Sequence, residues 1–226
     1  MEVFLKKQTV PTAFFGGSFD PPHTGHLAVA RGALNSGLCS HVIWAPAFAP
    51  PHKLDRRRAP FEHRMKMVGL LIKNEDSMSV SDIEAKIAKR PSYTIDILLE
   101  LEAQNGSRPA LLIGADSLLS LHTWHRCSEL AENWQILTYP RKESPVTLEA
   151  LLAHWPEKTA EKLFSGVIPG KFFEISSTEI RNSMEKNAFT GNIKCMTENI
   201  PEIGDYMTLH RLYGENSTKE TDYERN

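Results

Sequence analysis

Cysteine is scarce in this chain of 226 residues, which contains only three. Cys39, Cys127 and Cys195 form no Cys-x-x-Cys pair, so the sequence predicts neither a disulfide framework nor a cysteine zinc site. Unpaired cysteines fit a reducing compartment. We therefore expect a cytoplasmic protein.

Long apolar runs and an excess of charge of one sign are also missing. No run reaches the length of a membrane span, and Lys6, Lys7 and Pro11 interrupt the apolar N-terminus, so we expect neither a membrane span nor a signal peptide. Lys and Arg number 26 against 28 Asp and Glu, and the formal net charge is -2. A basic surface could then only be local, which argues against long nucleic acid as a partner.

Apolar runs of strand length alternate with longer segments of helical periodicity. The predicted strands are residues 12–15, 41–46, 77–83, 110–114, 134–139 and 171–175. The predicted helices are residues 24–36, 60–74, 93–104, 115–122, 126–132 and 147–164, followed by C-terminal helices up to residue 213. This alternation predicts an α/β fold with a Rossmann-like, doubly wound parallel sheet. We expect one domain over residues 1–214 and a frayed polar tail over 215–226.

The segment GGSFDPPHTGH, residues 16–26, joins the first predicted strand to the first predicted helix. Gly16 and Gly17 allow a sharp turn and the close approach of a ligand, and Thr24 is a suitable helix N-cap. In open α/β sheets ligands bind beyond the carboxyl ends of the strands, and free N–H groups at a helix start attract anions. We therefore expect this loop to bind a phosphate.

Two histidines flank the start of that helix. His23 precedes it and His26 lies in its first turn, so both imidazoles can face one phosphate while Gly25 leaves room between them. This arrangement suits phosphoryl or nucleotidyl transfer, in which catalysis is mostly positioning and charge stabilisation. In isolation the pattern would equally describe a Gly/Pro turn with packed histidines. The neighbouring glycines and the strand–loop–helix context favour the phosphate site.

A second anion cradle is predicted at ISSTEIR, residues 175–181, where a predicted strand leads into a helix. Ser176, Ser177 and Thr178 offer hydroxyl groups and N-caps, and Arg181 lies one turn inside the helix. A capped helix that binds nothing would explain one such hydroxyl. Hydroxyls, free amides and one arginine together favour an anion.

A third loop, APPHK at residues 49–53, follows the second predicted strand. It brings His52 and Lys53 to the same edge of the sheet, where a lysine can meet a phosphate as a point charge; a surface turn is the alternative. The charges of Arg56–Arg58 cannot all face one small ligand, so we expect a solvated loop there. Arg141, which follows the predicted strand 134–139, is a further candidate for a phosphate contact.

Together these motifs resemble the HxGH nucleotidyltransferase superfamily, and more closely the bacterial type of its nicotinate (nicotinamide) mononucleotide adenylyltransferase family. The segments LLIGADSLLSLHTW, SYTIDIL and IPEIGDYMTLHRLY resemble further parts of that family. Ile97 stands where the family more often has Thr, and His125 where it often has another aromatic residue. The last segment resembles a closing helix, with Tyr206 and Leu209 at core spacing.

The resemblance implies a role for each matching residue. Catalytic roles fall to His23, His26, Lys53 and Arg181. ATP-binding roles fall to Gly16, Gly17, Ser18, Phe19, His23, Gly25, His26, Gly114, Asp116, Ile175, Ser176, Ser177, Thr178 and Arg181. Mononucleotide-binding roles fall to Ser18, Phe19, His52, Lys53, Thr94, Ile95, Trp124 and His125.

The implied reaction transfers AMP from ATP to nicotinate mononucleotide and gives nicotinate adenine dinucleotide and pyrophosphate, a step of NAD biosynthesis. Magnesium would arrive with ATP, and we expect no metal site of the protein itself. Alternatives are a nicotinamide mononucleotide or dual-specificity enzyme, phosphopantetheine adenylyltransferase or a cytidylyltransferase. A nucleotide sensor and a tRNA-synthetase-like core represent other classes. The oligomeric state stays open and includes a homo-oligomer.

Overall fold

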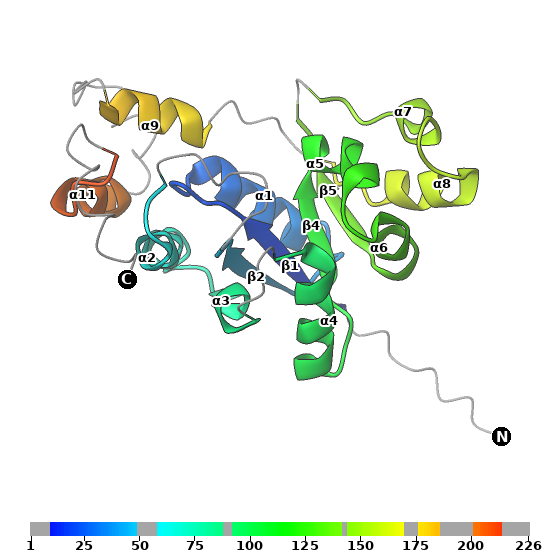
Figure 1. The fold of residues 1–226 in the computed structure, drawn as a ribbon, viewed down its shortest axis with the longest axis horizontal. Helices are drawn as coiled ribbons and strands as arrows, with labels where there is room; N and C mark the ends of the chain where they lie inside the picture. Colours follow the sequence, from blue (N-terminus) through cyan, green and yellow to red (C-terminus); the bar gives the residue numbers. More distant parts are fainter. Residues whose placement is uncertain are drawn as a thin grey trace, which may run out of the picture.

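The structure is a computed structural model that describes residues 10–48, 58–87, 92–141, 144–169, 176–185 and 201–213. Within them the chain forms a five-stranded parallel sheet with the order β3-β2-β1-β4-β5 (Figure 1). The strands are β1 (Thr12–Gly17), β2 (His41–Pro46), β3 (Met78–Val80), β4 (Ala110–Gly114) and β5 (Ile136–Tyr139). The predicted doubly wound sheet is confirmed. The predicted strand at 171–175 lies outside the described residues.

Helices connect the strands and follow the last one. They are α1 (Thr24–Asn35), α2 (Phe61–Leu71), α3 (Ile83–Ile87), α4 (Thr94–Asn105), α5 (Ala115–Leu119), the 3₁₀ helix η1 (Leu121–Thr123), α6 (Cys127–Asn133), α7 (Leu148–Leu152), α8 (Glu157–Ser165), α9 (Ser177–Glu185) and α11 (Pro201–Leu209). The single helix predicted over 147–164 is wrong, because Pro156 cannot continue a helix and instead caps α8. The strand predicted over 77–83 ends at Val80, and Ile83 begins α3.

Two hydrophobic cores cover the two faces of the sheet. Side chains of successive strand residues point to opposite faces, so Phe15 joins one core and Phe14 the other. The first core contains buried residues of α1, α2, α9 and α11. The second contains buried residues of α3 to α8. Helices on both faces explain why every strand reads as an apolar run.

The order of the strands also places the ligand-binding edge. The helix after β1 packs on one face of the sheet, whereas the helix after β4 packs on the other. The neighbouring carboxyl ends of β1 and β4 therefore form the switch point at which open α/β sheets bind ligands.

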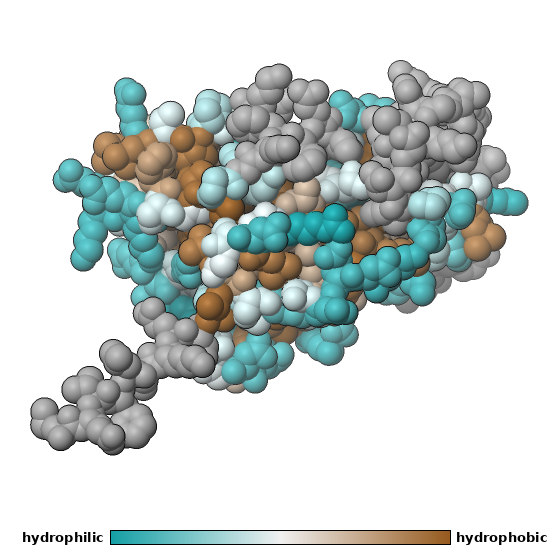
Figure 2. All heavy atoms as spheres, turned by 180° about the vertical axis from the view of Figure 1, so that it is seen from behind, coloured by the Kyte–Doolittle hydropathy of each residue, from teal (hydrophilic) through white to brown (hydrophobic). Residues whose placement is uncertain are grey.

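One patch of exposed apolar surface lies over the last two helices of the second core. Figure 2 shows brown surface at the upper left, where α7 and α8 lie. Leu152 and Phe164, from these two helices, are 44% and 41% exposed. Among the described residues, no helix combines the length and apolar character of a membrane span.

Replacement of two glycines by alanine should change the free energy of unfolding in opposite directions. In α2, a Cβ atom at Gly69 would meet no heavy atom within 4 Å, so Gly69→Ala should stabilise the protein by about 0.5–1 kcal/mol through backbone entropy. A Cβ atom at Gly166 would lie 2.0 Å from the Ile136 carbonyl oxygen of β5. Gly166→Ala should therefore destabilise the protein by about 1–3 kcal/mol. Urea unfolding measures both changes, and stabilisation by Gly166→Ala would contradict this packing.

Candidate active site

The loop between β1 and α1 brings His23 and His26 together. His23 is the N-cap of α1, with extended backbone angles (φ -148°, ψ 171°), and Thr24 is the first helical residue. The prediction of Thr24 as N-cap is therefore wrong. The Nδ1 atom of His26 accepts a hydrogen bond from the His23 backbone N–H at 3.3 Å. The His26 side chain thereby fixes the backbone of His23 at the start of α1.

The two imidazole rings lie with their centroids 3.8 Å apart. Burial and the positive charge of Arg141 lower the pKa of His23 to about 4. Burial, His23 and Arg141 together hold the pKa of His26 well below its ordinary value of 6.5. Both rings are therefore neutral at pH 7 in the free protein. Within the described part of the chain, the buried Nδ1 atom of His23 has no hydrogen-bond partner.

Aromatic packing explains the glycines at the end of β1. A Cβ atom at Gly16 would lie 2.9 Å from the ring of Phe14, and one at Gly17 would lie 3.1 Å from the ring of Phe19. The positive φ of this turn, 45°, belongs to Phe19 and not to a glycine. Phe19 is 2% exposed as a residue, and its ring packs on His26 and Trp44 beneath the loop.

A buried carboxylate, Asp20, organises the next part of the loop. Its Oδ1 atom accepts hydrogen bonds from the Tyr213 hydroxyl at 2.7 Å and from the Ala59 N–H at 3.1 Å. Arg58 is half-buried beside Asp20, and burial lowers the pKa of Arg58 while the charge of Asp20 raises it. The solvated loop expected over Arg56–Arg58 is therefore wrong for Arg58.

A buried arginine fixes the same loop from α2. Arg64 is 2% exposed, and its guanidinium donates to three carbonyl oxygens: to Ser18 at 2.9 Å, to Ala47 at 2.7 Å and to Ala59 at 3.0 Å. These bonds join the ends of β1 and β2 to the start of α2. A charged side chain that satisfies so many backbone acceptors cannot be replaced by an apolar one without leaving them unpaired.

The start of α9 lies directly against the β1–α1 loop. Ser176 and Glu179 form a reciprocal capping box, with bonds of 3.2 and 3.1 Å. Ser177 Oγ donates to the Pro21 carbonyl at 2.9 Å. Arg181 Nη1 donates to the Asp20 carbonyl at 2.5 Å. The two segments predicted as anion cradles are thus adjacent, and Thr178 belongs to the same cluster because its Oγ1 accepts from Arg181 Nη2 at 3.2 Å.

Arg141 lies on the opposite side of the histidines, after β5. Its Nε atom is 3.5 Å from Asp116 Oδ1, and the two side chains are 55% and 54% exposed. An ion pair with this exposure contributes little to the free energy of unfolding. Gly114 accommodates it closely, because a Cβ atom there would lie 2.7 Å from Asp116 Oδ1. Arg141 and Asp116 therefore border the space beside the histidines without being locked in place.

Four of the residues predicted to bind the mononucleotide come from α4 and from the segment after η1. Thr94 is the partly buried first residue of α4, whereas Ile95 is fully buried, main chain included. The rings of Tyr93 and His125 stack with centroids 4.1 Å apart and planes at 27°. Trp124, which precedes His125, packs against the core below. This stack brings the two segments side by side.

Several predicted residues cannot be placed. His52, Lys53 and Ile175 lie outside the described residues. In α11, Tyr206 packs against the first core as expected, but Leu209 is 77% exposed, so its assignment to the core is wrong. Ile203 and Met207 are the buried residues of that helix.

Sequence reasoning missed the residues that hold the loop in place. No role was predicted for Asp20, Arg64 or Tyr213. Arginine is almost never fully buried unless it is paired, so the sequence around Arg64 gave no reason to expect a buried side chain there. The proximity of Arg141 to the histidines agrees with its place among the candidate phosphate contacts.

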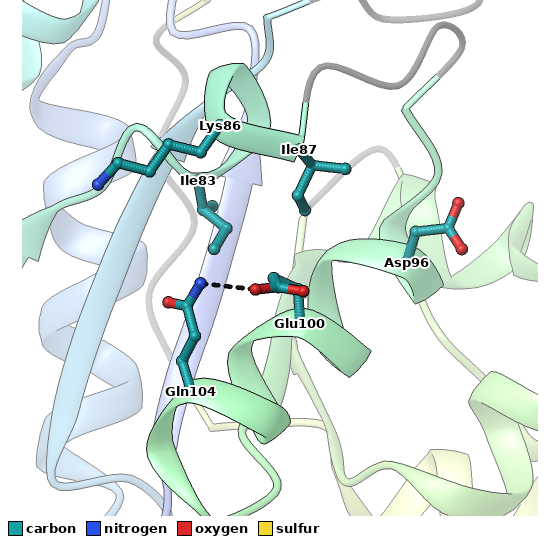
Figure 3. Close-up of a pocket in the computed structure, with 6 residues that line it drawn as sticks. All are labelled: Ile83, Lys86, Ile87, Asp96, Glu100 and Gln104. Carbon is teal, nitrogen blue, oxygen red and sulfur yellow. Dashed lines mark hydrogen bonds between the residues drawn. The ribbon is translucent and has the colours of Figure 1, made fainter.

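A separate hollow of about 280 Å³ lies between α3 and α4 (Figure 3). Its lining combines isoleucines with charged and amide side chains: Ile83, Lys86, Ile87, Asp96, Glu100 and Gln104. Within α4, Gln104 donates to Glu100 at 2.8 Å along one wall of the hollow (Figure 3). None of the predicted site residues lines this hollow, so it is not the space in front of the histidines.

The fold and these paired sites at helix starts define a cytidylyltransferase-like protein, and the family model of that description matches residues 14–183. A Symbiobacterium thermophilum relative named "probable nicotinate-nucleotide adenylyltransferase" is 41% identical over 89% of this chain and 94% of its own length. A Desulfotalea psychrophila relative of the same name is 31% identical over 88% and 97%. The chain belongs to the nicotinate-nucleotide adenylyltransferase family.

Solved structures agree on the architecture. Plasmodium falciparum nicotinic acid mononucleotide adenylyltransferase complexed with NaAD has a TM-score of 0.69, with 20% identity over 89% of this chain and 96% of that chain. The same protein complexed with APC has a TM-score of 0.70 at the same identity and coverage. At this identity the similarity confirms the fold.

The low pKa of His23 has a measurable consequence for titration. In NMR spectra of the free protein, the His23 ring should titrate near pH 4, with burial as the larger cause and Arg141 as the smaller. Arg141→Gln should raise the pKa of His23, and Arg141→Lys should not, because it keeps the charge. A wild-type midpoint near 6.5 would contradict the buried environment.

The same shift predicts acid lability. Below pH 6.5 the unfolded state binds a proton at this histidine while the folded state does not until about pH 4. The free energy of unfolding should therefore fall between these pH values by about 1.4 kcal/mol per pH unit. Arg141→Gln should narrow this window from its acid side. Urea unfolding at several pH values measures the slope.

Proposed function

We propose that this chain transfers the adenylyl group of ATP to nicotinate mononucleotide, releases pyrophosphate and forms nicotinate adenine dinucleotide in the cytoplasm. The observation that carries the proposal is the contact between the two helix starts through Asp20, beside the paired histidines and Arg141. Donors from two helices then converge on one polyphosphate.

The reaction needs no covalent intermediate. A phosphate oxygen of the mononucleotide attacks the α-phosphorus of ATP, and the bond between that phosphorus and the bridging oxygen to the β-phosphorus breaks. The electron pair leaves with pyrophosphate, and the attacking phosphate has no proton that must first be removed. The chain's contribution is positioning and charge stabilisation, which suits a site built from imidazole, guanidinium and hydroxyl groups.

The histidines act on the charge that develops on the α- and β-phosphates. In the free protein their pKa values are low because of burial and Arg141. A bound triphosphate brings negative charge next to the rings, which raises the same pKa values. His23 and His26 can then donate N–H groups, or take up protons, at the moment when charge must be stabilised.

Donors on the α9 side hold the outer phosphates in this proposal. Arg181 has N–H groups beyond those used on Asp20 and Thr178, because a guanidinium carries five. Ser177 would exchange its bond to Pro21 for a phosphate oxygen. Lys53 would add a point charge from the loop after β2.

Magnesium would enter as a complex with ATP and would neutralise charge on the leaving pyrophosphate. The carboxylates near the site fit this view. Asp20 is occupied by Tyr213 and Ala59, and Asp116 is paired with Arg141. The described residues contain no group of three or more His, Cys, Asp or Glu that could hold an ion.

The pyridine ring would lie near the start of α4 and Trp124. The first N–H group of α4, at the partly exposed Thr94, has no helical partner and can bind the nicotinate carboxylate. An amide in the same position would present its own donors to this N–H group. This difference supports nicotinate over nicotinamide mononucleotide as the substrate.

The substrate assignment is tested by pyrophosphate release from ATP and magnesium, with nicotinate and nicotinamide mononucleotides offered separately at equal concentration. We expect kcat/KM to be at least about tenfold higher for the acid, because the NH₂ group of the amide cannot accept a hydrogen bond from the N–H at the start of α4. Phosphopantetheine serves as the control acceptor. Comparable rates with acid and amide would indicate dual specificity, and turnover with phosphopantetheine alone would contradict the proposal.

The role of the histidines is tested by His26→Ala, which should keep the fold and lower kcat about a hundredfold or more. This is the usual loss when one preorganised charge-stabilising group is removed. His154→Ala is the control, because it also removes one imidazole, from an exposed residue with no predicted role in the site. Near-wild-type turnover of His26→Ala would remove His26 from the mechanism.

A further inference from the structure

A hydroxyl near the C-terminal end of the described chain reaches into the loop of the site. Tyr213 Oη donates to Asp20 Oδ1 at 2.7 Å, across 193 positions of sequence. Tyr213 is 8% exposed and Asp20 is 6% exposed, so water has little access to this bond. Burial and the Asp20 carboxylate hold the pKa of Tyr213 well above its ordinary range. The hydroxyl is therefore a permanent donor to Asp20.

Arg181 approaches the same aspartate from α9. Its Nη1 atom lies 3.9 Å from Asp20 Oδ2 and donates to the Asp20 carbonyl at 2.5 Å. Its Nη2 atom donates to Thr178 at 3.2 Å. Anchored along one edge, the guanidinium has a fixed orientation and keeps further N–H groups for an anion.

We propose that Tyr213 is a positioning residue for nucleotide binding: its hydroxyl fixes the Asp20 carboxylate, which in turn holds Arg181 in the orientation that meets the triphosphate. This inference rests on the function proposed above for the site. Without the hydroxyl, Oδ1 keeps only the Ala59 N–H, and the carboxylate can turn toward its neighbouring cations Arg58 and Arg64. Arg181 would then keep its hydrogen bond to the Asp20 carbonyl but lose the carboxylate charge that faces Nη1 at 3.9 Å and completes its orientation.

A purely structural role is the competing explanation, because Tyr213 also belongs to the first core. Tyr206 allows the two roles to be separated. It lies in α11, close to Tyr213 in the chain, and its hydroxyl makes a 2.9 Å hydrogen bond to His63 Nδ1 of α2. Tyr206→Phe therefore removes one hydroxyl and one hydrogen bond from the same C-terminal segment, without touching Asp20.

The test is calorimetric binding of α,β-methylene-ATP with magnesium to the wild type, Tyr213→Phe and Tyr206→Phe, together with steady-state kinetics. Tyr213→Phe should raise the Kd of the analogue and the KM for ATP about tenfold, as expected for losing a hydrogen bond to a charged group. Its KM for nicotinate mononucleotide should stay within about twofold, as should all constants of Tyr206→Phe.

A double-mutant cycle decides whether Tyr213 acts through Arg181. In an Arg181→Ala background, Tyr213→Phe should cause no further loss of affinity. Any one of three results would overturn the proposal. They are a further tenfold loss of affinity in the Arg181→Ala background, an unchanged Kd in Tyr213→Phe alone, and a tenfold loss in Tyr206→Phe.

A second variant covers the case in which Tyr213→Phe does not fold. Asp20→Asn keeps an acceptor for the Tyr213 hydroxyl and the Ala59 N–H but removes the charge that faces Arg181, so it should weaken binding of the analogue in the same way. Wild-type affinity in Asp20→Asn would also overturn the proposal. Because binding is read without turnover, a wild type that binds the analogue but releases no pyrophosphate would refute the proposed function and leave this inference intact.

Discussion

The buried charge of Asp20 is the constraint on which the geometry of the site depends. A carboxylate taken out of water is costly unless it is paired and hydrogen-bonded. Here Tyr213 and Ala59 donate to it, and Arg58, Arg64 and Arg181 surround it with positive charge. These groups come from three separate parts of the chain. Satisfying one charge therefore requires the start of α2, the start of α9 and the C-terminal turn to meet the loop after β1.

This arrangement explains how loops that carry functional side chains can hold them in fixed positions. Loops are usually the mobile part of a fold, whereas a transfer reaction needs its donors within a fraction of an ångström. Arg64 spans the ends of β1 and β2 with three hydrogen bonds to carbonyl oxygens. Ser177 and Arg181 bind carbonyl oxygens of Pro21 and Asp20. The rigid sheet edge is thereby extended by side chains, of which the buried Arg64 needs no contact with the substrate.

The sequence was informative about features that depend on residues close together in the chain. Alternating apolar runs predicted the parallel sheet, and the histidine and serine motifs predicted two helix starts at one edge. It was uninformative where a contact joins distant residues, such as Asp20 and Tyr213, because nothing at either position signals the other. The N-cap was also misassigned: Thr24 has the better capping propensity, but tertiary packing places His23 there. Propensity is a weak prior when a buried site fixes the backbone.

The neutral histidines follow from the same concentration of positive charge. Arg141 lies near the rings, Arg58 and Arg181 lie near Asp20, and the described site offers few free carboxylates in return. Charging both imidazoles in the empty site would add repulsion to the cost of burial, so the rings stay unprotonated. In the proposed function a bound triphosphate would reverse this balance, since its negative charge favours the protonated rings. The same electrostatic interaction would then contribute both to nucleotide affinity and to charge stabilisation during transfer, while the free protein avoids the cost of burying two positive charges.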